Sequence, residues 1–231
     1  MMSQNTGLLL ILAILTVIGV ISYLGSPFFA VENIYIDKLD FISREEIRKS
    51  LVQYKGENIW LVDKSRIRAA LKENKFIKDL QITKKIPNTI NILIEERIPV
   101  AAINNNGRYI VFDREGYILA EGAVSITADI PLLKDFGYSF SGEKIIFTEE
   151  VEEIIHALTY TDRDIRARIK HLEYNDGELT LKLVSGTVLM GDLIDLEKKF
   201  RVFNSVMDRQ LSENENVEYI DLRIVEKPVI K

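Results

Sequence analysis

The chain has 231 residues, of which 47% are hydrophobic and 28% charged, a composition that is ordinary for folded protein and long enough for two modest domains. Its net charge of −5 gives no electrostatic reason to expect a nucleic-acid partner. The absence of cysteine excludes disulfides, thiolate metal sites and a cysteine nucleophile.

The N-terminal segment predicts a membrane-spanning helix. Residues 7–25 read GLLLILAILTVIGVISYLG without a charged side chain, and at 1.5 Å per residue they span about 28 Å, close to the ~30 Å of bilayer hydrocarbon. A buried core helix is rarely so long and so apolar. A cleaved signal peptide would need a basic N-terminal region and small residues at the cleavage site, where this chain has Phe28. We therefore expect an uncleaved anchor after a short cytoplasmic tail at residues 1–6.

The charges near this helix do not orient it. No Lys or Arg occurs before Lys38, whereas the positive-inside rule needs basic residues beside the helix. A short uncharged tail is easily kept inside the cell, and large folded domains cross membranes regardless of their charge. We expect the bulk of the chain outside the cytoplasm.

Residues 26–97 predict a compact βααββ unit that begins with a strand at residues 30–36. The first helix should start at Ser43 as N-cap, with Glu46 closing a capping box. The apolar stripe expected on this helix consists of Ile47, Leu51 and Val52.

The second half of the unit follows a connection that contains Trp60, the only tryptophan. Asp63 should cap the second helix and Asn74 should end it. Two strands then follow at residues 76–85 and 89–97, and Pro87-Asn88 joins them.

From Pro99 onward, short strands and glycine turns predict successive hairpins. The expected turns are Asn106-Gly107, Glu115-Gly116, Asp176-Gly177 and Ser185-Gly186. Leu179, Leu181 and Leu183 alternate with polar residues and should face the core. Helices are expected at residues 148–160 and 195–210. The predicted fold class is α+β, with one transmembrane helix, the βααββ domain, and a mainly antiparallel β-domain with packed helices.

The closing segment, EYIDLRIVEKPVIK, predicts a strand. Ile220, Leu222 and Ile224 alternate with neighbours on the other face, which is the two-residue period of a half-buried strand. Pro228 has no N–H for a ladder, so it belongs at an edge or a strand end. We expect the β-domain to end on an edge strand.

No catalytic or metal site is predicted. His156 and His171 stand alone, and we expect both to be structural. Asp192, Asp195 and Glu197 lie close together, but they lack the alternating ligands and turn glycine of a calcium loop. They are expected to start the following helix. We predict that the chain is not an enzyme and uses no cofactor or metal.

Three stretches together are similar to one known family. They are FAVENIYIDKLDFISREEIRKSL, FIKDLQITKKIPNTINILIEERIPVAAI, and TVLMGDLIDLEKKFRVFNSVM with the later EYIDLRIVEKPVI. In this order and spacing the chain resembles the FtsQ/DivIB bacterial cell-division proteins over essentially its whole length. One departure is the N-terminal tail, which is usually longer and basic in this family.

The resemblance implies a POTRA (polypeptide-transport-associated) domain at residues 28–98 and a β-domain at residues 99–231. It also implies a scaffold without enzymatic activity, single-pass in the bacterial cell membrane and concentrated at the division septum. Such a scaffold binds FtsB/DivIC-like and FtsL-like proteins and helps localise and regulate the septal peptidoglycan synthase. The alternative is a POTRA protein for polypeptide transport or envelope assembly, but these usually carry tandem repeats and a barrel.

The resemblance also implies two partner-binding surfaces. A partner strand would add to the last strand, with contacts at Arg223, Ile224 and Glu226, while Asp221 and Leu222 stay structural. The alternative is that the strand only closes the sheet, its edge guarded by Lys227 and Pro228.

The second implied surface lies on the second POTRA strand, at Ile82 and Lys84, with Glu96 on its neighbour. The alternative there is a plain edge strand protected by lysines.

Overall fold

The computed structural model describes residues 4–122, 129–213 and 217–231, so the first three residues of the expected cytoplasmic tail lie outside the described range. The chain divides into two compact units, Met1–Glu96 and Arg97–Lys231. Each unit has its own cluster of buried hydrophobic side chains.

Helix α1 (Gln4–Leu24) forms the start of the first unit and begins three residues before the expected span. Within it, Thr6–Leu24 is long and apolar enough to cross a membrane, and none of this stretch is buried against the rest of the chain. Its single polar side chain in mid-helix, Thr16, donates its hydroxyl to the Leu12 carbonyl at 2.8 Å. An apolar helix with no protein around it is suited to a lipid environment.

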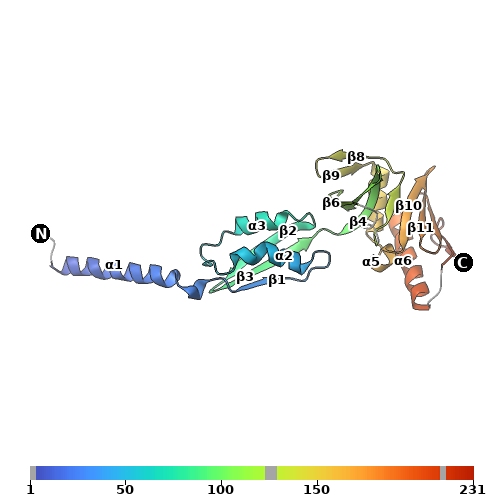
Figure 1. Ribbon diagram of the computed structural model, residues 1–231. Helices are drawn as coiled ribbons and strands as arrows, with labels where there is room; N and C mark the ends of the chain where they lie inside the picture. Colours follow the sequence, from blue (N-terminus) through green and yellow to red (C-terminus); the bar gives the residue numbers. More distant parts are fainter. Residues whose placement is uncertain (1–3, 123–128, 214–216) are drawn as a thin grey trace. The chain divides into compact units, whose positions relative to one another are not determined.

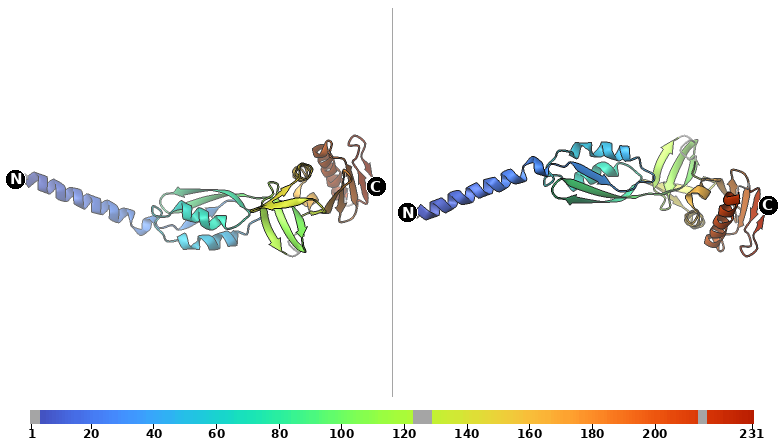
Figure 2. Two further views of the ribbon diagram at one scale, coloured as in Figure 1. Left: turned by 90° about the horizontal axis from the view of Figure 1, so that it is seen from above. Right: turned by 90° about the horizontal axis from the view of Figure 1, so that it is seen from below.

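The rest of the first unit is the expected βααββ arrangement. Its elements are η1 (Pro27–Phe29), β1 (Asn33–Ile36), α2 (Arg44–Leu51), η2 (Val52–Tyr54), α3 (Lys64–Lys72), β2 (Ile77–Lys85) and β3 (Thr89–Glu96). The sheet order is β1-β3-β2, with β1 parallel to β3 and β2 antiparallel to it. This order makes β1 and β2 the two edges of the sheet. Figures 1 and 2 show α2 and α3 on one face of it.

The helix caps confirm one prediction and correct another. The Asp63 carboxylate accepts from the Ser65 N–H at 2.8 Å, as expected for a cap of α3. Ser43 lies at the N-cap of α2 but makes no capping hydrogen bond. The expected capping box is absent because Glu46 accepts from the Asn74 side-chain amide at 3.0 Å instead.

The second unit is built on a nine-stranded sheet of order β14-β13-β12-β11-β10-β7-β4-β5-β6. These strands are β4 (Pro99–Asn105), β5 (Arg108–Asp113), β6 (Ile118–Gly122), β7 (Leu132–Lys134), β10 (Ile169–Asn175), β11 (Glu178–Leu183), β12 (Thr187–Gly191), β13 (Tyr219–Asp221) and β14 (Val229–Ile230). Most neighbours are antiparallel, as expected, but β7 runs parallel to β4 and β10, and β13 runs parallel to β12.

The four expected hairpin turns are all present. They join β4 to β5, β5 to β6, β10 to β11, and β11 to β12. Asn106-Gly107 and Asp176-Gly177 both have positive φ at the two central residues, the conformation that two-residue hairpins favour. The sequence reading missed β7, the separate hairpin of β8 (Tyr138–Ser141) with β9 (Lys144–Phe147), and the short helix α5 (Arg163–Arg166).

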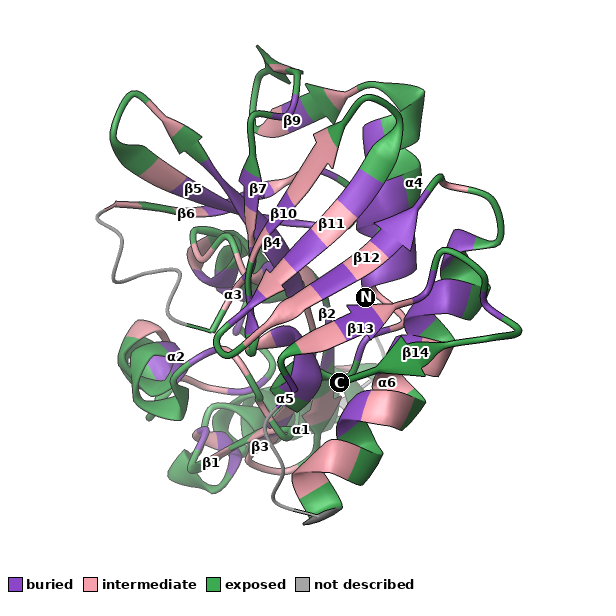
Figure 3. Cartoon of the chain, turned by 90° about the vertical axis from the view of Figure 1, so that its right-hand side faces the viewer, coloured by how far each residue is buried: buried purple, intermediate pink, exposed green. Residues whose placement is uncertain are grey.

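The two expected helices of this unit are α4 (Glu149–Leu158) and α6 (Leu196–Glu213). Their buried residues include Ile154 and Leu158 on α4 and Phe200 and Phe203 on α6, which join one core with the predicted inward leucines of β11. Figure 3 shows the alternation of buried and less buried residues along the strands, and it shows β14 as an exposed strand at the edge of the sheet.

Candidate functional site

The C-terminal segment is not one continuous strand, which corrects the sequence prediction. β13 ends at Asp221, and the Leu222 N–H makes a final bond to the Leu189 carbonyl at 2.8 Å. The chain then turns, with the Lys227 N–H donating to the Ile224 carbonyl at 3.0 Å. It returns as β14 antiparallel to β13. The residues expected to carry the docking strand therefore lie in the loop between two strands.

The turn is stabilised by a contact between Asp221 and Arg223. The Arg223 guanidinium donates to both carboxylate oxygens, at 3.0 Å from Nε and 2.7 Å from Nη2, and the Tyr219 hydroxyl and the Arg223 N–H donate to them as well. The hydrogen bond from the Arg223 side chain is the main reason why the pKa of Asp221 falls to about 2. Asp221 is therefore engaged within the turn, and Leu222 is buried in the core.

The three predicted contact residues are used differently in the folded chain. Arg223 is held by Asp221, and Glu226 forms an ion pair with Lys198 of α6 at 2.7 Å. The hydrogen bond from Lys198 lowers the pKa of Glu226. Ile224 is 62% exposed. All three side chains are exposed, and Ile224 is the apolar one among them.

β14 forms the C-terminal edge of the sheet. The Lys231 N–H donates to the Tyr219 carbonyl at 2.9 Å and the Tyr219 N–H donates back at 3.1 Å, so Lys231 faces β13. Main-chain groups alternate in direction along a strand, and Ile230 therefore points its N–H and C=O away from β13. Val229 and Ile230 are 49% and 39% exposed. Pro228 precedes this strand, as expected of a proline near an edge.

The second predicted surface, on β2, is only partly a surface. β2 is an edge strand with exposed Thr83 and Lys85. Lys84 is half-buried, and the Ile82 side chain is buried in the core of the unit. The Ile82 side chain faces the helices because of its position in the two-residue period. Partner binding at Ile82 stays a prediction, and it would involve the main chain of this residue.

Glu96 has a structural position within the first unit. Its carboxylate accepts three main-chain N–H groups in the segment between β1 and α2, from Asp40 at 2.6 Å, Phe41 at 3.0 Å and Ile42 at 2.7 Å. Hydrogen bonds from main-chain N–H groups to an ionised carboxylate are charge-assisted and therefore strong. These bonds order the chain just before α2, where Ser43 provides no cap. The side chain expected to contact a partner is therefore already engaged.

We expect Glu96→Gln to destabilise the first unit by about 2 kcal/mol, because the neutral amide places an N–H₂ group among N–H donors. Amide hydrogen exchange, followed in the full chain by mass spectrometry, should accelerate at Asp40, Phe41 and Ile42. The neighbouring Glu95→Gln is a matched control. Glu95 is exposed and pairs with Lys78 at 3.3 Å, so its loss should cost no more than about 0.5 kcal/mol. Equal exchange in the two variants would contradict the role given to Glu96.

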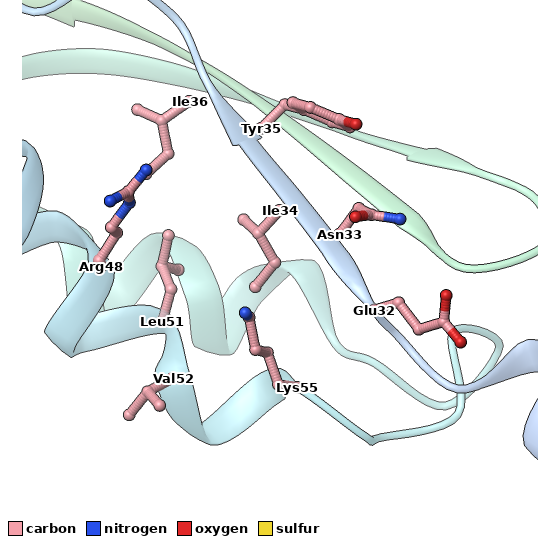
Figure 4. A pocket seen from close by; sticks show the side chains of 9 residues that line it. All are labelled: Glu32, Asn33, Ile34, Tyr35, Ile36, Arg48, Leu51, Val52 and Lys55. Atoms are coloured by element: carbon pink, nitrogen blue, oxygen red, sulfur yellow. The ribbon is translucent and has the colours of Figure 1, made fainter.

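A groove that the sequence reading did not anticipate lies between β1 and α2. Its volume is about 320 Å³, and its lining includes Ile34, Ile36, Arg48, Leu51 and Lys55. Figure 4 shows the side chains that line the groove opposite β1, with Arg48 at one end and Lys55 at the other. Val52 also lines it and is exposed, so it is not buried with Ile47 and Leu51, the other members of the expected apolar stripe. Arg48, Val52 and Lys55 recur at helical spacing, and this pattern in the sequence could have indicated the helix side of the groove.

The residues considered for chemistry have structural partners. Asp192 binds the buried ammonium of Lys199 at 2.8 Å, and this hydrogen bond lowers the pKa of Asp192. Glu197 lies in the first turn of α6, as expected, and pairs with Arg201. His156 contacts the Tyr160 ring, and His171 lies 3.3 Å from Glu173. Within the described ranges, no group of three or more acidic or histidine side chains could hold a metal ion.

Comparison with known families covers both units. The family described as "POTRA domain, FtsQ-type" matches residues 29–97, and the family described as "Cell division protein FtsQ/DivIB, C-terminal" matches residues 101–223, more than half of the chain. The chain belongs to the FtsQ/DivIB family. The matched C-terminal region includes β13 and ends at Arg223, so Ile224 and β14 follow it.

Relatives in this family are named as cell division proteins. The chain is 25% identical to DivIB of Clostridium tetani over 88% of this chain and 80% of the relative. It is 24% identical to FtsQ of Rickettsia felis over 84% and 69%. It is also 24% identical to DivIB of Staphylococcus aureus over 87% and 46%. A solved structure of the major extracytoplasmic domain of DivIB from Geobacillus stearothermophilus aligns with 50% of this chain and 97% of that domain, at 13% identity and a TM-score of 0.36.

Proposed function

We propose that this FtsQ/DivIB protein is a non-enzymatic scaffold of the division machinery. The helix α1 anchors it with the N-terminus in the cytoplasm, and the two folded units lie outside the membrane at the division septum. There it binds FtsB/DivIC-like and FtsL-like proteins and helps localise and regulate septal peptidoglycan synthesis. The observation that carries this proposal is the C-terminal edge of the sheet, which is formed by the short, exposed strand β14.

An edge strand is suited to receiving an extended segment of another protein. Main-chain hydrogen bonds supply affinity in such strand addition, and alternate side chains supply specificity. β14 has two residues, and the one whose N–H and C=O point outward is Ile230. Pro228, two residues earlier, points its main-chain groups to the same side as Ile230 but has no N–H to donate. We therefore place the main hydrogen-bonded contact at Ile230. Ile224 and the two charged residues Arg223 and Glu226 lie in the preceding loop and form the rest of this surface.

The open edge of β2 is a second, weaker docking surface in this proposal. A segment added there would bond to main-chain groups and meet the side chains of Thr83, Lys84 and Lys85. Ile82 and Glu96 would support that surface from within the unit, because one is buried and the other holds the segment before α2.

The test is binding of the full chain, in detergent micelles, to the extracytoplasmic segment of an FtsB/DivIC-like protein. A chain that ends at Lys227 lacks β14 but keeps β13 and its buried neighbours. We expect it to bind about tenfold more weakly or worse, since two or three hydrogen bonds at ~0.5–1.5 kcal/mol each are lost.

The variant Ile230→Pro sharpens the test, because it removes the outward N–H without removing a bond to β13. Its affinity should fall by roughly threefold to tenfold. Ile230→Thr is the matched control, since it changes the side chain and keeps the N–H, and it should bind more tightly than the proline variant. Unchanged binding by the shortened chain would show that β14 is not the docking edge. Tighter binding would show that β14 covers the docking edge on β13, and either result overturns the proposal.

A further inference from the structure

Aromatic side chains gather where α1 meets the first folded unit. The Tyr23 and Phe29 ring centroids are 5.3 Å apart, Phe28 and Phe29 are 5.1 Å apart, and Phe29 and Trp60 are 5.8 Å apart. Phe29 belongs to the buried core of the unit, whereas the other three rings are exposed. The cluster therefore has a buried centre and an apolar rim that no part of the described chain covers.

The loop that carries Trp60 is bonded directly to the end of the membrane helix. The Asn58 side-chain amide donates to the Leu24 carbonyl at 2.6 Å, and the Asn58 side-chain oxygen accepts the Trp60 N–H at 3.0 Å. The last carbonyls of a helix have no partner within it, and leaving them unpaired is costly at the edge of a bilayer. Asn58 thus satisfies the helix end and holds its own loop at that depth.

The depth of that point follows from the length of the helix. α1 has 21 residues, which at 1.5 Å per residue gives about 31 Å, close to the ~30 Å hydrocarbon thickness. Leu24 then lies at one boundary of the hydrocarbon, and the loop bonded to it lies in the headgroup layer. Trp60 is 51% exposed there and Leu61 is 81% exposed. Tryptophan and tyrosine favour this layer because their rings are apolar with one polar end.

We propose that residues 58–61, together with Tyr23 and Phe28, form a membrane-interface contact that inserts Trp60 and Leu61 among phospholipid headgroups. The partner is the outer boundary of the bilayer itself. The contact holds the first folded unit against the membrane surface, so that α1 and the unit are joined by more than a flexible connection. This inference rests on the proposed membrane insertion of α1.

Trp60 makes the test direct, because it is the only tryptophan in the chain. The full chain is reconstituted into vesicles of phosphatidylcholine and phosphatidylglycerol, and flotation first establishes whether the protein is inserted. Its emission is then measured with lipids brominated near the headgroup end or near the middle of the acyl chain. We expect a blue-shifted spectrum and a loss of roughly half the emission to the shallow quencher, with less loss to the deep one.

The control places a tryptophan of similar exposure elsewhere on the unit. Leu93 is 48% exposed on β3. Thr89 pairs with Asn33 at the start of β1, the end of the sheet nearest in sequence to α1. Leu93 lies four residues farther along β3, away from that end. In a Trp60→Phe background, Leu93→Trp should show a water-like spectrum that lipid bromine does not quench. If the chain floats but Trp60 behaves like the Leu93→Trp reporter, the interface contact is wrong while the anchoring stands. If the chain does not float, the proposed anchoring fails and the interface contact fails with it.

Discussion

Asp113→Asn should destabilise the second unit by about 3 kcal/mol, because it breaks a buried ion pair and a turn at once. Asp113 is buried. One carboxylate oxygen lies 2.5 Å from the Arg97 guanidinium, and the other accepts the N–H groups of Glu115 and Tyr117 at 2.9 Å each. The guanidinium also lies 3.7 Å from the Tyr117 ring centroid. An asparagine presents an N–H₂ group to one of these donors, and it leaves the largely buried Arg97 to the more distant carboxylate of Glu115 at 3.5 Å.

The second unit has no tryptophan, so its stability is best followed by amide hydrogen exchange. Exchange in the β5–β6 hairpin should rise first, and the core strands β10 and β11 should follow as the unit opens. Glu121→Gln serves as the control, because Glu121 is an exposed residue of β6 and its change should stay within about 0.5 kcal/mol. If the two variants exchange alike, Asp113 does not hold the turn in the way described.

The hairpins and long helices were predictable because their signals are local. Asn106-Gly107 and Asp176-Gly177 carry in two residues the preference for positive φ that a tight hairpin needs. α4 and α6 show the helical period over many residues, and their buried faces follow from it. Such features need no knowledge of what packs against them.

β7 and the loop after β13 were not predictable in this way. β7 is three residues long and is a strand because it lies parallel between β4 and β10, which are distant in sequence. Pairing of that kind leaves no pattern within the segment itself. In the C-terminal segment the two-residue period continues through Ile224, but the hydrogen bonds from Arg223 to Asp221 turn the chain first. A contact between side chains has no signature in an alternating pattern.

The same limit applies to the candidate sites. Pro228 correctly indicated an edge near the C-terminus, because a missing N–H has a fixed consequence for the ladder. Which residues form that edge depended on the turn, so Val229 and Ile230 form it while Arg223 and Glu226 lie in the loop. On the first unit, the family resemblance implies that Glu96 lies on a partner-binding surface. Its structural role has no local signature, because its partners, Asp40 to Ile42, lie more than fifty residues earlier in the chain.

The C-terminal edge therefore depends on how firmly β13 is held. β13 pairs with β12 on one side and with β14 on the other. β14 is therefore joined to the rest of the sheet through the three residues of β13. Whatever moves β13 away from β12 also moves β14. A substitution between β12 and β13 would disturb the edge and leave every side chain of β14 unchanged. It therefore distinguishes docking on the main chain of the edge from docking on individual side chains.

Gly186→Ala is the substitution that should do this. A Cβ on Gly186 would lie 2.2 Å from the Val217 carbonyl oxygen and 2.8 Å from that of Glu218, and both are main-chain atoms at the entry to β13. Neither can rotate aside, so the strand must shift and strain the bond from the Thr187 N–H to the Glu218 carbonyl, now 3.1 Å. We expect a loss of about 3 kcal/mol in the second unit, at the upper end for overpacking.

Gly137→Ala provides the matched control, since nothing lies within 4 Å of a Cβ at Gly137 and its φ is not positive. That variant should be neutral or slightly stabilising, because alanine reduces the freedom of the unfolded chain. Hydrogen exchange at Tyr219 and Lys231 should rise in Gly186→Ala and stay unchanged in Gly137→Ala. Binding of the FtsB/DivIC-like segment should fall in the first variant alone. A Gly186→Ala protein with loosened β13 and β14 but full affinity would mean that the partner binds elsewhere, with the open edge of β2 the next surface to examine.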